Sequence, residues 1–489
     1  MELTELINSV HVIQVVGNVQ RKDVTGIYYD SRRVGKGSVF VAIKGLNTDG
    51  HRFINEALNK GAIAVILEDD DAVPDEIFLH TGTAKILVKD SRTALAEISK
   101  GYYKNISEKI KLIGITGTKG KTTTAFIIKS ILETAGIKTG LIGTIANYIG
   151  DKKIESSLTT PESNDLNELL LEMYSQGCSY VVMEVSSHAL ALKRVYGLNF
   201  TAAVFTNISS DHLDFHKNFE NYLSAKKILF DNLSSSAFGV YNVDDKSSPR
   251  IIENRVAPLY SLGKSPGADF LIDNISYNLI GTNFDLINDN RNYSLSTGLV
   301  GEFNAYNAAF AFAVTTLTGI DPDTAVKGIH TTPQVPGRFE ITGRGNKKVI
   351  IDYSHNADSL EKTLLALRNI IAGKHPLYTV FGCGGNRDRT KRPVMGKIAA
   401  DLSKKVFITS DNPRNEDPLE IIEEIKSGIK KNNYEVIEDR EEAIKQAISQ
   451  SESDAVILIA GKGHETYQEI RGVKKHFSDR EVAERYLDL

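Results

Sequence analysis

A glycine-rich turn between a strand and a helix is the feature that most restricts how this chain can fold. The run Lys111-Leu-Ile-Gly-Ile-Thr-Gly-Thr-Lys-Gly-Lys-Thr-Thr-Thr124 begins apolar, passes through glycines and continues into the helical pattern of residues 125–132. Backbone N–H groups of such a turn can surround phosphate oxygens, Lys121 adds a mobile positive charge, and Thr122 offers a hydroxyl to Mg²⁺. The order strand, turn, helix therefore predicts a nucleotide-phosphate loop.

The spacing of this loop departs from the usual form. The pattern G-x-x-x-x-G-K-[ST] would place its first glycine at Ile115, whereas Gly114 and Gly117 flank that position. A glycine-rich turn that binds nothing is the alternative, so the rest of the chain must show what a bound phosphate would serve.

Length and composition limit the kind of protein. A chain of 489 residues is expected to form about three domains, at roughly 100–200 residues each. A net charge of -4 gives no reason to expect nucleic acid or a membrane as a partner. Two cysteines, Cys178 and Cys383, are too few for a disulfide scaffold, and no apolar run approaches 18 residues. We expect a cytoplasmic monomer.

Strand-like and helical runs alternate along the whole chain, which predicts an α/β fold of three domains. The first is a small α/β domain, the second a mononucleotide-binding parallel sheet that carries the phosphate loop, and the third a Rossmann-like open sheet. A turn-rich linker is expected at residues 331–338. The expected boundaries are 1–108, 109–335 and 336–489.

Polar loops follow the buried strands expected in the C-terminal domain. Because the carboxyl ends of parallel strands meet along one edge of an open sheet, and such edges bind ligands, we expect these loops to lie together. They comprise residues 352–356, 382–388, 411–414 and 461–465.

Two residues of the central domain are candidate metal ligands. Glu184 ends the apolar run Tyr180-Val-Val-Met, so it is expected beside the phosphate loop, where a second carboxylate normally completes a Mg²⁺ shell. His212 follows the next strand and is expected on the same edge. The alternatives are a surface glutamate at a strand end and a loop histidine without a ligand.

Lys226 lies on the apolar face of an expected helix, with Tyr222, Leu223, Leu229 and Phe230 three or four residues away. A lysine there must extend its ammonium to solvent, lower its pKa or be modified. Carbamylation by CO₂ would convert the cation into an anion able to accompany Mg²⁺. The spacing alone leaves these alternatives open.

Six short motifs follow one another along the chain, at residues 116–123, 184–190, 211–214, 301–307, 336–340 and 352–355. Their order resembles the Mur ligase family over essentially the whole chain. One departure is the run Asp352-Tyr-Ser-His-Asn-Ala-Asp358, which the family usually has as Asp-Tyr-Ala-His-Thr-Pro-Asp.

The resemblance implies an ATP-dependent amide ligase of peptidoglycan precursor synthesis. Within the family, residues 382–389, 411–414 and 461–465 resemble the members that add the third residue of the stem peptide. In such a reaction, ATP phosphorylates the D-Glu carboxylate of UDP-MurNAc-L-Ala-D-Glu, Mg²⁺ assists, and an amine of meso-diaminopimelate attacks the acyl phosphate. Nearby positive charge is needed because the transfer joins two anions.

The resemblance also assigns residues to roles. Catalysis is assigned to Lys121, Glu184, His212 and Lys226, and the metal to Thr122, Glu184, His212 and Lys226. ATP is assigned to Gly117, Thr118, Lys119, Gly120, Lys121, Thr122, Thr123, Asn304, Arg338 and Asp352. The substrates are assigned to Ser31, Thr159, Thr160, Ser186, Arg194, Arg387, Asp411, Asn412, Pro413, Arg414, Gly461 and Glu465.

Arg414 is expected to select the amino acid. Meso-diaminopimelate and L-lysine differ by one carboxylate, which a guanidinium can bind through two parallel hydrogen bonds, and Asn412 can add a donor. The resemblance adds Arg387 for a carboxylate. Three alternatives stay open: the same ligase adding L-lysine, an enzyme like the folylpolyglutamate synthetases, and a scaffold that binds nucleotide without chemistry.

Overall fold

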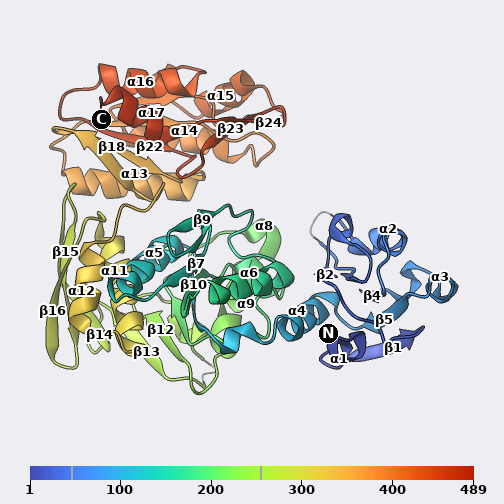
Figure 1. Cartoon of the computed structure of the whole chain (residues 1–489). Helices are drawn as coiled ribbons and strands as arrows, with labels where there is room; N and C mark the ends of the chain where they lie inside the picture. The colour runs from blue at the N-terminus through green and yellow to red at the C-terminus, as the bar shows by residue number, and fades with distance from the viewer. Residues whose placement is uncertain (46–47, 254–255, 489) are drawn as a thin grey trace. The chain divides into compact units, whose positions relative to one another are not determined.

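The computed structural model describes residues 1–45, 48–253 and 256–488 (Figure 1). The chain divides into two compact units, Met1–Leu271 with Phe310–Ala325, and Ile272–Ala309 with Val326–Leu489. Both units alternate strands and helices. The division between the two units falls within β14 (Phe270–Tyr277) and within α11 (Glu302–Leu317). It does not test the domain boundary expected at residue 335, which stays a prediction.

The first unit opens with a sheet of strand order β1-β5-β4-β3-β2, in which β1–β5 is antiparallel and the other neighbours are parallel. The residues of β3 and β4 are fully buried, as the continuous apolar runs of central strands require. The elements are α1 (Leu3–Ile7), β1 (Val12–Val16), β2 (Ile27–Tyr28), β3 (Val39–Val41), α2 (Ile54–Asn59), β4 (Ala64–Leu67), α3 (Asp75–Thr81), β5 (Ala84–Val88) and α4 (Ser91–Tyr102).

The second sheet of this unit carries the phosphate loop. From β14 it runs β13-β12-β11-β6-β10-β7-β8-β9, parallel as far as β7, with antiparallel strands β8 and β9 at the edge. The strands are β6 (Lys111–Thr116), β7 (Thr139–Ile142), β8 (Asn147–Ile149), β9 (Lys152–Ile154), β10 (Tyr180–Glu184), β11 (Ala202–Phe205), β12 (Phe238–Asn242) and β13 (Leu259–Gly263). Because β6 lies between β10 and β11, the loops after these three strands are neighbours.

Amphipathic helices pack against this sheet. Apolar residues of α6 and α9 share one core with β6, β10 and β11, including Leu170, Leu223 and Val181. Asn218 caps α9 by accepting a hydrogen bond from the N–H of Asn221. The helices are α5 (Lys121–Thr134), α6 (Ser163–Ser175), α7 (Ser187–Ala191), α8 (Leu213–His216), α9 (Phe219–Asp231) and α10 (Ser248–Ile251).

In the second unit, β15 (Thr282–Asn288) and β16 (Arg291–Thr297) pair antiparallel. Two helices follow in the chain, α11 and α12 (Pro322–His330), and both cross the division between the units.

The C-terminal sheet has the strand order β17-β18-β22-β19-β20-β21, parallel except for the edge pair β17–β18. Insertion of β22 between β18 and β19 brings the loops after β18, β19, β20 and β22 to one edge. The strands are β17 (Glu340–Arg344), β18 (Lys347–Asp352), β19 (Leu377–Phe381), β20 (Lys405–Ile408), β21 (Tyr434–Val436) and β22 (Val456–Ala460).

Helices cover both faces of the C-terminal sheet. Alternate residues of β18 separate the two cores: Ile350 packs with α13, α14 and α15, while Val349 and Ile351 pack with α16 and α17. The helices are α13 (Ala357–Ile371), α14 (Lys391–Leu402), α15 (Pro418–Lys426), α16 (Arg440–Gln450) and α17 (Asp479–Tyr486). A separate hairpin joins β23 (Tyr467–Ile470) to β24 (Val473–His476).

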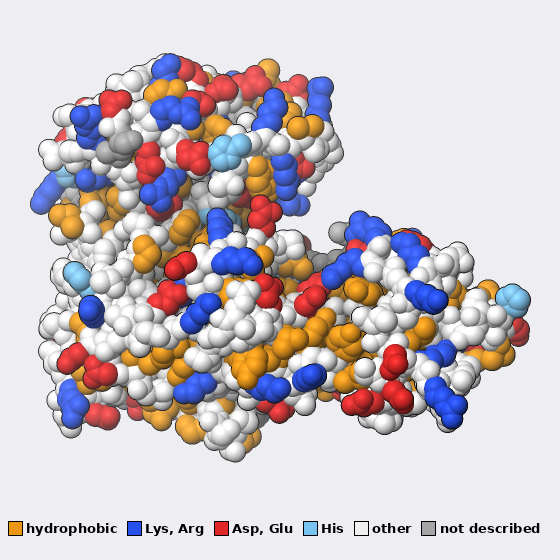
Figure 2. Space-filling view, in the orientation of Figure 1, with side chains coloured by type: hydrophobic (Ala, Val, Ile, Leu, Met, Phe, Trp, Pro, Cys, Tyr) orange, Lys and Arg blue, Asp and Glu red, His pale blue; other side chains and the backbone are white. Residues whose placement is uncertain are grey.

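Across the described residues, no helix is both long enough and apolar enough to cross a membrane. On the face of each unit visible in Figure 2, basic and acidic side chains are interspersed.

Candidate active site

The predicted phosphate loop joins β6 to α5, and its glycines are required by the backbone. Gly117 has φ +150° and Gly120 has φ +87°, and a Cβ at Gly117 would lie 2.0 Å from Thr206 Oγ1. The loop is held from the end of β11, because the N–H groups of Thr118 and Lys119 donate to the carbonyl and side chain of Asn207. These hydrogen bonds anchor the turn, which opens onto the N-terminus of a 14-residue helix.

Two lysines meet at one carbonyl of this loop. Lys121 Nζ and Lys226 Nζ each lie 2.8 Å from Gly117 O. Lys226 is 1% exposed and its Nζ lies 4.5 Å from the centre of the Tyr222 ring. Burial, with repulsion from Lys121, lowers the pKa of Lys226 well below its ordinary value of 10.5. The alternative in which Lys226 extends to solvent is thus wrong, because α9 presents it inward to the loop.

Glu184 is a buried carboxylate beside the loop. It is 1% exposed, so the alternative of a surface glutamate is wrong. Thr122 Oγ1 donates to one of its oxygens at 2.9 Å, and Thr144 donates to both through its hydroxyl and N–H at 3.0 and 2.8 Å. The structure therefore brings together two of the predicted metal ligands, Thr122 and Glu184.

His212 lies at the start of α8 with φ +52° and a half-exposed side chain. Its ring packs edge-on against His188 at 4.8 Å between centroids, and lies 6.3 Å from the ring of Tyr222. The Tyr222 hydroxyl in turn pairs with Thr118 Oγ1 at 3.0 Å. His212 is thus linked to the loop through aromatic neighbours.

Four residues predicted for the substrate surround the end of β10. Thr160 Oγ1 donates to Glu184 O at 2.8 Å and receives the N–H of Ser186 at 3.2 Å. The Thr159 hydroxyl pairs with that of Thr144, which itself donates to the Glu184 carboxylate. Arg194 donates to Glu162 at 3.0 Å and to Thr160 O at 3.1 Å.

Ser31, the fifth of these residues, lies in the N-terminal sheet domain. It is 6% exposed, and its hydroxyl donates to Glu56 at 2.8 Å. The neighbouring Arg32 side chain is 84% exposed, so this turn is solvated at Arg32 but not at Ser31.

In the second unit, Arg338 and Asp352 lie near each other. The guanidinium of Arg338 stacks over the Tyr353 ring at 5.0 Å, and its buried Nε has no hydrogen-bond partner within the described part of the chain. Asp352 accepts from the N–H of Phe339 at 2.9 Å and from the Ser354 hydroxyl. Asn304, buried in α11, donates to Val300 O at 2.9 Å.

The polar loops at the edge of the C-terminal sheet converge, as expected. Asn412 donates to Glu465 at 2.8 Å, and its own carbonyl oxygen accepts from Lys462 Nζ at 3.0 Å. A Cβ at Gly461 would lie 2.6 Å from Asp411 Oδ2, so glycine permits this approach. Burial raises the pKa of Glu465, and the positive charge of Lys462 acts in the opposite direction.

Both predicted carboxylate-binding arginines flank Gly384 on the loop after β19. A Cβ there would lie 2.9 Å from Arg414 Nη1 and 3.8 Å from Arg387 Cγ. Arg387 is exposed, whereas Arg414 donates to Gly385 O at 2.8 Å. The carbonyl of Pro413 lies against Gly385, so the loops after β19 and β20 are closely packed.

Three residues of these sites were missed from the sequence. Thr144 holds the Glu184 carboxylate, and Lys462, fully buried, lies 3.5 Å from Glu465 and 3.8 Å from Asp411. Arg392, also fully buried, pairs with Glu416 and Glu424 and donates to Gly384 O. The lysine within Gly461-Lys-Gly-His-Glu465 was the available signal for Lys462. The other two positions carry no such signal.

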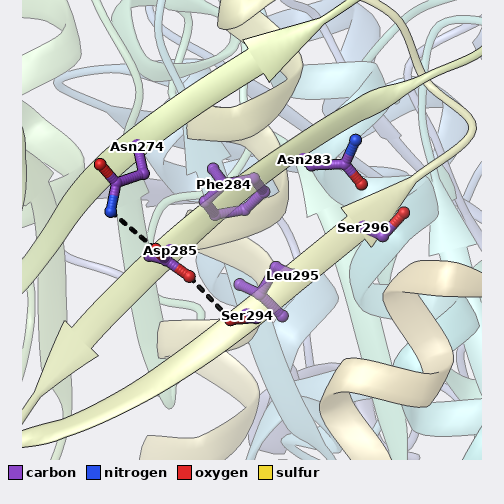
Figure 3. Close-up of a pocket in the computed structure, with 7 residues that line it drawn as sticks. All are labelled: Asn274, Asn283, Phe284, Asp285, Ser294, Leu295 and Ser296. Atoms are coloured by element: carbon purple, nitrogen blue, oxygen red, sulfur yellow. Dashed lines mark hydrogen bonds between the residues drawn. The ribbon is translucent and has the colours of Figure 1, made fainter.

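A pocket of about 310 Å³ lies away from the predicted residues, on β14, β15 and β16 (Figure 3). Its polar groups bond to one another, since Asn274 and Ser294 both donate to Asp285 at 2.8 Å. Among the described residues, no three His, Cys, Asp or Glu side chains are grouped so as to hold a metal ion.

Three family descriptions match successive parts of the chain: "Mur ligase family, catalytic domain" at residues 23–103, "Mur ligase middle domain" at 115–315, and "Mur ligase, glutamate ligase domain" at 337–463. The chain belongs to the Mur ligase family. It is 44% identical to a Clostridium botulinum (strain ATCC 19397 / Type A) protein named UDP-N-acetylmuramoyl-L-alanyl-D-glutamate--2,6-diaminopimelate ligase, over 96% of each chain.

Solved structures agree with this family. A UDP-N-acetylmuramoyl-L-alanyl-D-glutamate--2,6-diaminopimelate ligase is 30% identical, with a TM-score of 0.72 over 100% of this chain and 99% of that one. A folylpolyglutamate synthase from Thermotoga maritima has a TM-score of 0.61 at 19% identity, over 76% of this chain and 89% of that one, so it shares the fold alone. The predicted family, three-domain α/β fold and ligase class are confirmed.

Proposed function

We propose that this chain is an ATP-dependent ligase of peptidoglycan precursor synthesis. It joins meso-diaminopimelate to UDP-MurNAc-L-Ala-D-Glu through an acyl phosphate, as a cytoplasmic monomer. The single observation that carries the proposal is the meeting of the phosphate loop with a buried lysine and a buried carboxylate, at Gly117, Lys226 and Glu184. The domains are proposed to divide at residues 108 and 335.

The chemistry explains why positive charge gathers at the loop. A carboxylate becomes an acyl donor only when it carries a good leaving group, and its phosphorylation brings two anions together. Lys121, now bonded to the carbonyls of Gly117 and Thr118, can swing from them to the phosphates. Residues 117–123 would surround the phosphates through the loop and the start of α5.

The donor set beside the loop fits Mg²⁺, which prefers oxygen ligands. Thr122 and Glu184 already share a hydrogen bond, so both oxygens face one position, and His212 is the proposed third ligand. A Mg²⁺ bound there would neutralise phosphate charge. Thr144 orients the carboxylate through two hydrogen bonds.

We propose that Lys226 is carbamylated. Burial lowers its pKa and so favours the uncharged amine, which attacks the carbon of CO₂ and loses one proton to water, giving a carbamate anion. The product removes the repulsion between Lys121 and Lys226, and it places a negative charge where it can accompany the metal.

The nucleotide is proposed to lie against Asn304, Arg338 and Asp352. The buried Arg338 Nε supports this role, since an unsatisfied guanidinium N–H is costly to keep in a protein interior. The UDP-sugar peptide is proposed to contact Ser31, Thr159, Thr160, Ser186 and Arg194. Four of these side chains line the end of β10, next to the proposed metal ligands.

The loops of the C-terminal sheet are proposed to hold meso-diaminopimelate. Arg387 and Arg414 would receive carboxylates, and Gly461 and Glu465 the amino-acid group at the other end. Asp411, Asn412 and Pro413 shape the wall between them. Asn412 was expected to add a donor for the carboxylate, but its amide N–H₂ donates to Glu465, so its proposed role is to orient that glutamate.

The alternatives make different predictions. A lysine-adding ligase would not need Arg414 to bind a second carboxylate of the amino acid. A folate ligase would not consume ATP when the UDP-sugar peptide is the acceptor substrate. A nucleotide-gated scaffold would release no phosphate that depends on both a carboxylate and an amine.

The test is ATP consumption by the purified protein with UDP-MurNAc-L-Ala-D-Glu and a panel of diamino acids. We expect ADP to form only when both substrates are present, with meso-diaminopimelate preferred over L-lysine by at least about tenfold. Arg414→Ala should lose that preference. ADP formation independent of the amino acid, or equal use of lysine, contradicts the proposal.

A further inference from the structure

The hairpin β23–β24 is bonded along the loop that carries Arg414. The Gln468 side chain donates to Asp411 O at 2.8 Å, and the N–H of Glu469 donates to the Asn412 side chain at 2.9 Å. The N–H of Arg414 donates to Glu469 O at 3.0 Å, and that of Arg471 donates to Arg414 O at 2.7 Å. The hairpin is therefore one wall of the proposed amino-acid site.

This bonding fixes both Arg414 and the carboxylate that faces it. Arg414 has φ +52°, a backbone conformation uncommon for arginine, which the two bonds to the hairpin stabilise. Its side chain donates to Gly385 O, and its Nε lies 3.6 Å from Glu469 Oε2. The side chains of Arg414 and Glu469 are 22% and 25% exposed, so a ligand can still reach the pair.

The position of Glu469 bears on selectivity. When an amino acid without a second carboxylate binds, an isolated arginine would lose water and find no partner, which is what rejects lysine. With Glu469 beside it, Arg414 keeps a counter-ion. When meso-diaminopimelate binds, its second carboxylate must share the Arg414 guanidinium with Glu469, so that carboxylate contributes less to the free energy of binding.

We propose that Glu469 is a specificity-determining residue, a built-in counter-ion of Arg414 that makes the site more tolerant of diamino acids lacking the second carboxylate. This inference rests on the proposed ligase function. It concerns the Glu469 side chain alone, because the hydrogen bonds that hold the loop use the Glu469 backbone.

The test compares kcat/KM for meso-diaminopimelate and for L-lysine in four proteins: the native chain, Glu469→Gln, Glu469→Asp and Glu441→Gln. Glutamine keeps the shape and removes the charge, and aspartate keeps the charge. Glu441 pairs with Arg485 at 2.5 Å on the exposed side of α16, so it is a matched control for losing an ion-paired glutamate. Long incubations and mass spectrometry allow a weak lysine product to be measured.

We expect the preference for meso-diaminopimelate over lysine to rise about fivefold in Glu469→Gln, as for a partly exposed ion pair. The change should appear in KM for the amino acid, with KM for ATP unchanged. Glu469→Asp should stay near the native preference, and Glu441→Gln should equal it.

Two results would overturn the inference while leaving the ligase function intact. One is an unchanged or lower preference in Glu469→Gln, and the other is a native protein that makes no lysine product at all, because Glu469 would then confer no tolerance. A native protein that makes neither product overturns the proposed function, and this inference with it.

Discussion

The buried ion pair between Arg440 and Asp479 gives the sharpest test of how the C-terminal site is supported. Both side chains are fully buried, and they form two parallel hydrogen bonds of 2.7 and 2.8 Å. Arg440 also donates to Ala460 O at 3.0 Å, immediately before Gly461. The pair therefore joins the starts of α16 and α17 to the end of β22. Asp479→Ala removes one member of this pair.

The expected loss is large because the substitution strands a buried charge. Arg440 would keep only the Ala460 carbonyl, and its Nη1 already lacks a partner among the described residues. Removing one member of a buried pair costs about 3–5 kcal/mol, whereas replacing both with apolar groups is often neutral or stabilising. We thus expect Asp479→Ala to lose about 3–5 kcal/mol, and Arg440→Met with Asp479→Leu to recover most of that loss.

Urea unfolding followed by circular dichroism measures the loss, and amide hydrogen exchange locates it in α16, α17 and β22. Glu484→Ala is the control, because its pair with Arg480 is partly exposed and should be worth less than about 1 kcal/mol. An Asp479→Ala variant as stable as Glu484→Ala, or a double variant as unstable as the single one, would refute the reasoning.

Three further outcomes are expected. Lys226→Met should abolish ligation, yet in CO₂-free buffer it should unfold at the temperature of the native protein or above. Since burial lowers the pKa of Lys226, the native protein loses stability as the pH falls below 10.5. Thermal scans should therefore show that the difference in unfolding temperature between the two proteins shrinks as the pH is raised toward 10.5. Because burial raises the pKa of Glu465, KM for meso-diaminopimelate should rise on acidification at a higher pH than an ordinary carboxyl would give, and a pH profile of Glu465→Gln should be flat there. Burial raises the pKa of Cys383 to about 12 and also that of Cys178, so a thiol reagent should label neither cysteine in the native protein and both after unfolding; rapid labelling at neutral pH would contradict the burial.

Much of the fold was predictable because the central strands of its sheets are mostly apolar. The run Tyr180–Glu184 is a strand with the expected bounds, since its residues are buried and the apolar residues Val181–Met183 lead directly to Glu184. The phosphate loop was predictable for a different reason, because Gly117 and Gly120 occupy conformations that other residues rarely adopt. The strand β15 was not predictable in the same way, because its alternation of buried and exposed residues is only partial.

Contacts between distant side chains were not predictable. The spacing around Lys226 placed it on an apolar face but could not decide between solvent and interior, which depends on α9 packing against the loop. Arg392 and Glu469 act through partners that are distant in the sequence, so no local pattern marks them. Lys462 lies within the motif of residues 461–465, but the sequence could not show that it is buried beside Asp411 and Glu465. The role of Asn412 was assigned differently because the sequence could not reveal Lys462 and Glu465 on its two sides.

The central claim is that amide formation passes through an acyl phosphate made by this chain. If the D-Glu carboxylate that becomes the amide carries ¹⁸O, attack by the amine must release a phosphate that has taken one oxygen from that carboxylate. Mass spectrometry of the phosphate after a reaction with UDP-MurNAc-L-Ala-D-Glu, meso-diaminopimelate and ATP measures this directly. We predict one ¹⁸O atom in the phosphate for each amide formed, and phosphate without the label would contradict the account.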